Sequence, residues 1–229
     1  MKKLVLLFFV FTFAINACGG PSTPAPTPTP TPDEWLDRAA QAVLDLKSAQ
    51  FSLLREGAPV VLDPATQITF SEATGKYQAP DRVSATAKIT LLGNVVEIQM
   101  LWLPEGAFVS NPLTQTFQPI SADTQFNGAA LFRAEGLPAV LKDGIRNAAF
   151  VGAENIEELI TYHLKGRADG AQLAALTAGA LAAGTDYDVD VWLDPSSANL
   201  VRIHITEADG SGWTIELFAI NEAVEIKAP

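Results

Sequence analysis

Residue types that could carry out catalysis are sparse in this 229-residue sequence. The two histidines are His163 and His204, and the one cysteine is Cys18. The motifs G-x-S-x-G and S-x-x-K do not occur, so an activated serine would lack its usual neighbours. We therefore predict no catalytic residues, although a triad assembled from residues distant in the sequence stays open as an alternative.

Metal and cofactor motifs are also lacking. Asp186, Asp188 and Asp190 imitate the start of a calcium-binding EF-hand loop, but Val191 stands where glycine should make the turn and Ser197 where glutamate should close the site. On a strand, side chains two residues apart lie about 7 Å apart, which suits a solvated face better than one cation. No glycine-rich phosphate cradle is present. We predict no metal site and no cofactor.

Residues 1–17 have the composition of a secretory signal peptide. Lys2 and Lys3 precede an apolar run, residues 4–15, in which Thr12 is the one polar residue. This run is shorter than the roughly 20 residues that a membrane-spanning helix needs. We expect residues 1–17 to direct export and to be removed.

Cys18 stands at the expected cleavage point. Residues 15–18, Ile-Asn-Ala-Cys, resemble the bacterial lipobox, in which a peptidase cuts before a cysteine that carries a diacylglyceryl group, although Asn16 is larger and more polar than usual. A lone cysteine cannot form an internal disulfide framework, and two acyl chains would hold the protein stably on a membrane. We expect a lipid anchor at Cys18, with palmitate among its acyl chains, on the extracytoplasmic side of the cell membrane or outer envelope. A chance cysteine in an ordinary signal peptide is the alternative.

The charge balance is acidic. Removing residues 1–17 takes away two of the 15 basic side chains and none of the 26 acidic ones, which leaves a formal charge of −13. Such a surface repels nucleic acid and anionic headgroups. We therefore expect no nucleic acid partner, and membrane attachment through the N-terminal lipid rather than through a basic patch.

Composition divides the chain after the signal into two parts. Residues 18–32 contain the cysteine and a proline- and threonine-rich stretch without charge, which favours a polyproline II spacer of roughly 35 to 40 Å. Binding by a proline-recognising module, or O-glycosylation of Thr27, Thr29 and Thr31, stays open for this stretch. We predict that residues 33–229 form a single domain with a sizeable core.

A helix should open the domain, followed by strands. Thr31 and Glu34 form a capping-box pattern around Pro32, and apolar residues at three- and four-residue spacing predict a helix over 32–47. Alternation over 82–91 and, after the turn Gly93-Asn94, a second run over 96–102 predict an antiparallel hairpin with one wet face. Further strands are expected at 50–56, 59–62, 67–73, 107–110 and 115–119.

The second half of the chain mixes helix and strand patterns. We predict short helices at 126–133 and 137–145, strands at 146–153 and 157–167, and an Ala- and Leu-rich helix from Asp169 to about Leu181. Three strands, at 185–193, 200–208 and 213–220, and a short extended end at 224–227 follow. The apolar pattern of the last hairpin places Asp190 opposite His204 and Trp192 opposite Arg202 on its outer face, and a structural role for His204.

The order of these parts resembles the LppX/LprG group of bacterial lipoproteins, whose architecture is similar to LolA and LolB. The resemblance includes the helix running into Lys-Ser-Ala-Gln-Phe at 47–51, Val-Gly-Ala-Glu-Asn-Ile at 151–156, Tyr-His-Leu-Lys-Gly at 162–166, and the hairpin from 191–194 to 200–202. It implies an α+β fold: a strongly curved antiparallel half-barrel whose concave side is covered by helices, with a hydrophobic cavity between them for acyl chains of glycolipids or triacylglycerols.

The sequence is compatible with such a cavity. Ala85 and Ala87 take inward positions where a filled core would favour larger residues, although they could equally let the first helix approach closely. The predicted lining residues are the apolar members of the central hairpin and of the two short helices: Val83, Ala85, Ala87, Ile89, Val96, Ile98, Met100, Leu131, Leu137, Val140 and Leu141.

Two functions follow from this pattern. The first is a monomeric, non-enzymatic lipoprotein that binds lipid or glycolipid acyl chains for transport or presentation. The second is a protein-interaction or sensor lipoprotein that uses the same fold with a closed core and lacks a cavity of more than a few hundred Å³. An envelope hydrolase ranks third.

Overall fold

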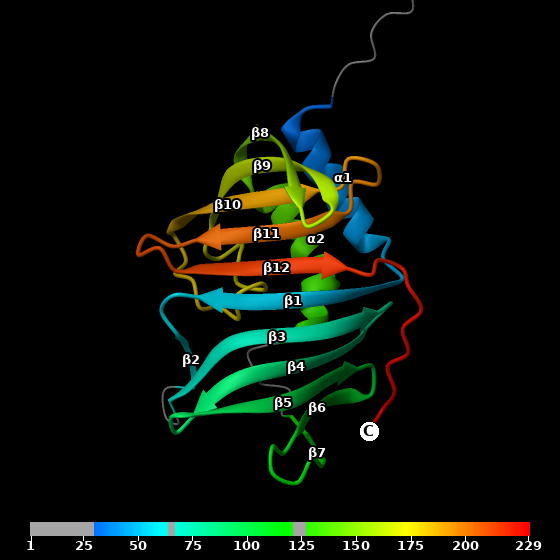
Figure 1. Ribbon diagram of the computed structural model, residues 1–229, viewed down its shortest axis with the longest axis vertical. Coiled ribbons are helices and arrows are strands. Elements are labelled where there is room, and N and C mark those ends of the chain that lie inside the picture. The colour runs from blue at the N-terminus through cyan, green and yellow to red at the C-terminus, as the bar shows by residue number, and fades with distance from the viewer. Residues whose placement is uncertain (1–29, 64–66, 121–126) are drawn as a thin grey trace, which may run out of the picture.

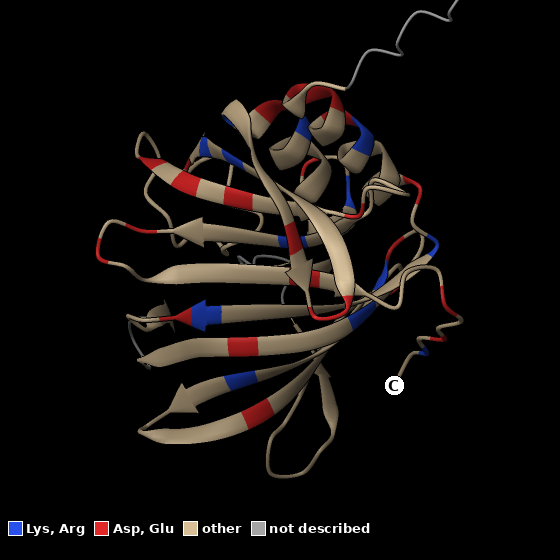
Figure 2. Ribbon diagram, turned by 45° about the horizontal axis from the view of Figure 1, so that its top comes forward, with Lys and Arg blue, Asp and Glu red and all other residues tan. Residues whose placement is uncertain are grey.

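The fold is organised around one curved antiparallel sheet (Figures 1 and 2). A computed structural model describes residues 30–63, 67–120 and 127–229. Within these residues the strands are β1 (Ser48–Glu56), β2 (Val60–Asp63), β3 (Ile68–Gln78), β4 (Arg82–Leu91), β5 (Asn94–Leu103), β6 (Gly106–Ser110), β7 (Phe117–Pro119), β8 (Arg146–Ile156), β9 (Leu159–Asp169), β10 (Asp186–Leu193), β11 (Leu200–Thr206) and β12 (Gly212–Phe218). Their order is β7-β6-β5-β4-β3-β1-β12-β11-β10-β9-β8, and β2 pairs with β3.

Alternation of side chains gives the sheet a buried and an exposed face. On β4, Val83, Ala85 and Ala87 are buried, whereas Lys88 is exposed. The predicted hairpin with β5 is confirmed, because Ala85 lies opposite Met100 and Ala87 opposite Ile98. Pairing of β1 with both β3 and β12 joins the first half of the chain to its end. We call the buried face, which β1 supplies with Phe51 and Leu53, the concave face.

Helix α1 (Pro32–Leu44) covers one half of the concave face, against β8 and β11 (Figure 1). The predicted capping box is present: the Thr31 hydroxyl accepts a hydrogen bond from the Glu34 backbone N–H at 3.3 Å, and the Glu34 carboxylate accepts one from the Thr31 N–H at 2.8 Å. The helix ends at Leu44, before the predicted Lys47. The Lys47 carbonyl instead accepts a hydrogen bond from the Ala79 N–H, just after β3, so the chain has already left the helix there.

The two predicted short helices are shorter still. They form a 3-10 turn, η1 (Gly128–Phe132), and an α-helical turn, α2 (Leu137–Ala139), which continues into a π-helical turn, η2 (Val140–Gly144). The Phe132 ring stacks on Tyr77 of β3 at a centroid distance of 4.2 Å. These turns therefore cover the concave face as predicted, although Phe126 lies outside the described residues.

The predicted helix over 169–181 is wrong. The segment forms successive turns, in which the Leu173 carbonyl accepts hydrogen bonds from the N–H groups of Leu176 and Thr177. Gly170 is tightly enclosed, since a Cβ there would lie 2.2 Å from the Ala182 carbonyl oxygen, and Ala178 takes a positive φ of 52°. This loop connects β9 to β10, and its packing overrides the helix preference of its alanines.

Three further differences concern strand ends. β3 continues past the predicted residue 73 through Gly75. A Cβ at Gly75 would lie 2.4 Å from the Phe51 ring, so the glycine lets this ring approach the strand closely and does not mark a turn. β8 continues to Ile156 through an irregularity in its register between Phe150 and Gly152. Residues 224–227 form no strand; instead Ile226 packs against Leu101 and Leu103 on the outer face of β5.

The register of the last predicted hairpin is confirmed, with Asp190 opposite His204 and Trp192 opposite Arg202. The Trp192–Arg202 pair is also in contact, since the Arg202 guanidinium lies 5.7 Å from the Trp192 ring centroid. The other pair has different partners: His204 Nδ1 lies 2.8 Å from the Thr214 hydroxyl, and Asp190 lies 2.7 Å from His163 Nε2. Cross-strand opposition therefore predicted one of the two side-chain contacts.

Candidate functional site

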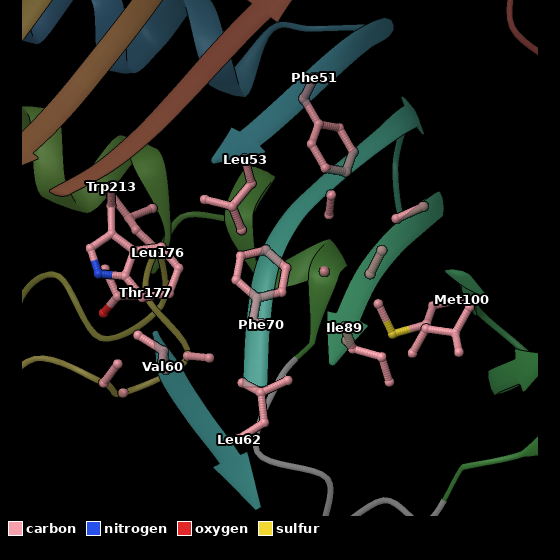
Figure 3. A pocket seen from close by; sticks show the side chains of 18 of the residues that line it. Phe51, Leu53, Val60, Leu62, Phe70, Ile89, Met100, Leu176, Thr177 and Trp213 are labelled. Carbon is pink, nitrogen blue, oxygen red and sulfur yellow. The ribbon is translucent and has the colours of Figure 1, made fainter. Parts of the chain in front are cut away.

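An apolar cavity of about 340 Å³ lies under the concave face of β1, β3, β4, β5 and β12 (Figure 3). Strand β2 borders it on one side, and the loop 176–180 closes it on another. Its lining residues come from the sheet, from β2 and from the covering loops: Phe51, Leu53, Val60, Val61, Leu62, Phe70, Ala73, Ala85, Ala87, Ile89, Ile98, Met100, Trp102, Ile120, Gly128, Leu176, Thr177, Ala178, Gly179, Ala180 and Trp213.

Small residues on two adjacent strands make room for the cavity. Ala73 of β3 lies opposite Ala87 of β4, and Gly75 lies opposite Ala85. Because the alanine side chains end at Cβ, they leave unfilled the space that larger side chains would occupy in a packed core, whereas the Phe51 ring fills the space above Gly75. The prediction that Ala85 and Ala87 only let the first helix approach is not supported, since both line the cavity and α1 packs against β8 and β11.

Aromatic side chains form one wall of the cavity. Phe70 of β3 stacks on Trp213 of β12 with centroids 5.8 Å apart and planes 16° apart. Phe51 packs against Phe132 of η1 at 5.6 Å, which joins this wall to the covering turns. Stacked rings are stiff and interlocked, so they hold the cavity open in one shape.

The cavity reaches solvent along β2. Val61 and Leu62 line it and yet remain 44% and 41% exposed. An apolar molecule would therefore reach the cavity past the side chains of Val61 and Leu62.

The lining carries almost no chemical reactivity. Among the described residues that line the cavity, none is titratable and Thr177 alone has a hydroxyl group. That hydroxyl donates a hydrogen bond to the Leu173 carbonyl at 3.1 Å. The geometry therefore suits burial of apolar groups rather than bond cleavage.

Comparison with known proteins assigns this architecture to a family. The family model described as LppX_LprAFG lipoprotein matches residues 31–226, which is most of the chain. The chain belongs to the LppX_LprAFG lipoprotein family. The resemblance found in the sequence is thereby confirmed. A search of curated proteins gave no significant match.

Two solved structures share the LppX_LprAFG fold. LprF from Mycobacterium bovis is 19% identical in sequence and superposes with a TM-score of 0.68, covering 88% of this chain and 98% of its own. The lipoprotein LppX from Mycobacterium tuberculosis is 16% identical, with a TM-score of 0.62 and coverage of 86% and 98%. These likenesses confirm the α+β class, with a curved antiparallel sheet and helices on its concave side.

The predicted lining residues divide into two groups. The cavity brings together Ala85, Ala87, Ile89, Ile98 and Met100. The others do not line it: Val96 is half-buried near the start of β5, and five residues lie within the solid core of this LppX_LprAFG domain, namely Val83, Leu131, Leu137, Val140 and Leu141. Burial of a helical turn therefore did not indicate contact with the cavity.

Sequence reasoning missed the aromatic wall and the closing loop. Phe51 and Leu53 alternate with polar residues in β1, a signal that could have placed them on the concave face. Trp213 and Phe70 meet because β3 and β12 both pair with β1, which the local pattern of neither strand reveals. The residues of the 176–180 loop were assigned to a helix, so their position over the sheet was not predicted.

A cluster of polar side chains lies away from the cavity, on the outer face of β8, β9 and β10. His163 is held between two carboxylates, with Nδ1 2.8 Å from Glu154 and Nε2 2.7 Å from Asp190, and it stacks on Trp192 at 4.4 Å. Hydrogen bonds from Trp192 and then from His163 lower the pKa of Glu154. Because both ring nitrogens of His163 face carboxylates, neither is available to accept a proton from a nucleophile.

The described residues contain no group of three or more His, Cys, Asp or Glu side chains placed to hold a metal ion. Across the same residues, no helix has the length and apolar character to span a bilayer. Cys18, the predicted signal peptide at 1–17 and most of the predicted linker at 18–32 lie outside the described residues.

Proposed function

We propose that this protein is an exported envelope lipoprotein that holds lipid acyl chains in its cavity, for transport or presentation, without catalysing a reaction. The observation that carries the proposal is the apolar cavity of about 340 Å³, with its floor of small residues and its mouth at Val61 and Leu62. Membership of a lipoprotein family supports the envelope location.

The size and lining of the cavity suit an acyl chain. Its volume lies in the lower part of the roughly 300 to 1,000 Å³ range of ligand pockets. Each CH₂ group that leaves water for such a lining contributes roughly 0.8 kcal/mol, so a chain can bind by burial alone. The apolar lining and the opening at Val61 and Leu62, more than the volume itself, favour lipid binding over a sensor with a closed core.

The N-terminal segment would keep this binding domain near a membrane. We propose that Cys18 carries the lipid anchor and that residues 18–32 act as a spacer of roughly 35 to 40 Å before α1. The acidic surface, with a formal charge of −11 for the full chain, argues against electrostatic attachment to anionic lipids.

Filling the cavity tests the proposal. Ala87→Phe places a ring in the space above β4, whereas Thr86→Phe adds the same ring on the opposite face of the same strand. We expect A87F to weaken binding of a fluorescent fatty acid by about tenfold or more, because displacing even two CH₂ groups removes about 1.6 kcal/mol of burial. T86F should bind within about twofold of the wild type.

Thermal unfolding of both variants controls for damage to the fold. An A87F protein that unfolds cooperatively and binds the fatty acid as tightly as T86F would contradict the proposal.

A further inference from the structure

The indole N–H of Trp213 is a buried hydrogen-bond donor at the wall of the cavity. Trp213 is 1% exposed, and its Nε1 has no hydrogen-bond partner within the described part of the chain. Buried polar groups are nearly always paired, so a donor that lines a ligand cavity without a partner indicates that the ligand supplies one.

Contacts on its ring fix the orientation of this donor. Phe70 stacks on the indole, and the Arg55 guanidinium lies 5.2 Å from the ring centroid. Arg55 is itself held by an ion pair with Glu207 and by a hydrogen bond from its Nε to the Ala58 carbonyl at 2.8 Å. The indole therefore cannot turn easily toward another acceptor.

Figure 3 shows the Trp213 nitrogen and the Thr177 hydroxyl oxygen on the same side of the cavity, but the Thr177 oxygen accepts no hydrogen bond from the indole. Thr177 uses its hydrogen to bond the Leu173 carbonyl. This corner thus offers a donor to a ligand, while most of the other described lining residues are apolar.

We propose that the Trp213 N–H donates a hydrogen bond to the carbonyl oxygen of an acyl ester in the bound lipid. The inference rests on the proposed lipid binding and narrows the ligand class to molecules that bring an ester carbonyl into the cavity. A free fatty acid offers the same carbonyl, but an ionised carboxylate in this corner would lack a free countercharge, because the nearby Arg55 is already paired with Glu207.

This contact also orients the bound acyl chain. With the carbonyl at Trp213 on β12, the hydrocarbon tail runs across β1, β3 and β4 over Ala73 and Ala87, toward Met100 on β5.

Two ligands of similar length test the inference on protein purified from expressing cells and stripped of lipid. Methyl dodecanoate carries the ester carbonyl, and tetradecane does not; dodecanoic acid serves as the third arm. Displacement of a fluorescent apolar probe measures each affinity for the wild type and for Trp213→Phe, which keeps an aromatic ring and removes the donor. We expect the substitution to weaken methyl dodecanoate about 3- to 10-fold and tetradecane less than about twofold.

Trp102→Phe is the matched control, because Trp102 also lines the cavity. It should leave the ratio of ester to alkane affinity unchanged. A second readout needs no variant that might fail to fold: the Nε1–H proton resonance of Trp213 in the wild type should move downfield on addition of methyl dodecanoate and not of tetradecane.

The outcomes separate this inference from the proposed function. If the wild type binds neither the ester nor the alkane, lipid binding itself is wrong and the inference fails with it. If both bind but W213F weakens both equally, or if the indole resonance does not respond to the ester, the cavity binds lipid without the hydrogen bond. Stronger dependence on Trp213 for dodecanoic acid than for the ester would overturn the ester assignment.

Discussion

Four neighbouring positions on β3 and β4 show how single residues determine what the sheet can hold. Ala73, Gly75, Ala85 and Ala87 face one another in pairs across the two strands, and none extends beyond Cβ. On the same face, Phe70 and Trp213 fill their space with stacked rings. The alternation of minimal and large side chains leaves an enclosed apolar volume where uniform aliphatic residues would leave none.

On the outer face, Glu154 ties β8 to β9 and β10. It accepts hydrogen bonds from Trp192 Nε1 at 2.9 Å and from His163 Nδ1 at 2.8 Å, which lower its pKa from the ordinary 4.5. A carboxyl group with a lowered folded-state pKa stabilises the protein above its unfolded-state pKa, and this contribution is lost as pH falls through the folded-state value.

We therefore predict that Glu154→Gln destabilises the protein at pH 7 and that the difference from wild type shrinks toward zero as pH falls below about 4.5. The loss at pH 7 should be small, because 44% of the Glu154 side chain is exposed. Urea unfolding at a series of pH values measures this difference. In a Trp192→Phe background, which lacks the largest cause of the shift, the pH dependence should weaken; an unchanged dependence would contradict the assignment.

At the scale of elements, α1 depends on its first turn. The helix lacks basic residues in its last turn, so the reciprocal hydrogen bonds of Thr31 and Glu34 are its main polar stabilisation at the ends. Thr31→Ala removes the side-chain acceptor and should lower the free energy of unfolding by about 1 kcal/mol.

Thr31→Ser keeps the hydroxyl and should retain most of that stability. Urea unfolding followed by circular dichroism measures both variants. Equal losses for T31A and T31S would show that the methyl group, rather than the cap, is responsible.

Elements whose own residue pattern determines their structure were predictable, and elements whose structure depends on contacts with distant residues were not. β4 alternates along its length and β5 alternates from Val96 to Met100, and the register of the hairpin follows from that pattern. The 169–181 segment has the composition of a helix, but burial of Leu173 and Leu176 beneath the sheet imposes a chain of turns.

The lining residues of the cavity divide in the same way, into those that the pattern of their own strand predicts and those that tertiary pairing places there. Ala85, Ala87 and Ile98 were predicted from the alternation of their own strands, whereas Trp213 enters through the pairing of β1 with β12. The predicted helical contributors, such as Leu137 and Val140, instead fill the core beside α1. Tertiary pairing thus decided which apolar residues face the ligand space.

At the scale of the whole molecule, α1 and the cavity lie under different halves of one sheet (Figure 1). α1 packs against β8 and β11 and η2 against β9, whereas η1 contacts β4 and the cavity lies toward β3, β4 and β5. The chain enters the domain at α1, in the packed half. A spacer before α1 would let the cavity half turn toward or away from the membrane while Cys18 stays anchored.

The acidic residues in Figure 2 are distributed over strands and loops rather than gathered in one patch. We therefore expect Cys18, and not the surface of the domain, to hold the protein on the membrane. Cys18→Ser should move the protein from the membrane fraction to the soluble fraction without emptying the cavity.

Native mass spectrometry of the Cys18→Ser protein, purified from lipid-producing cells, tests the central claim most directly. We predict a population whose mass exceeds that of the chain by one lipid, with an acyl ester recovered on organic extraction. A protein that carries the mass of the bare chain in every preparation, with no lipid in the extract, would contradict the assignment of the cavity as a lipid-binding site.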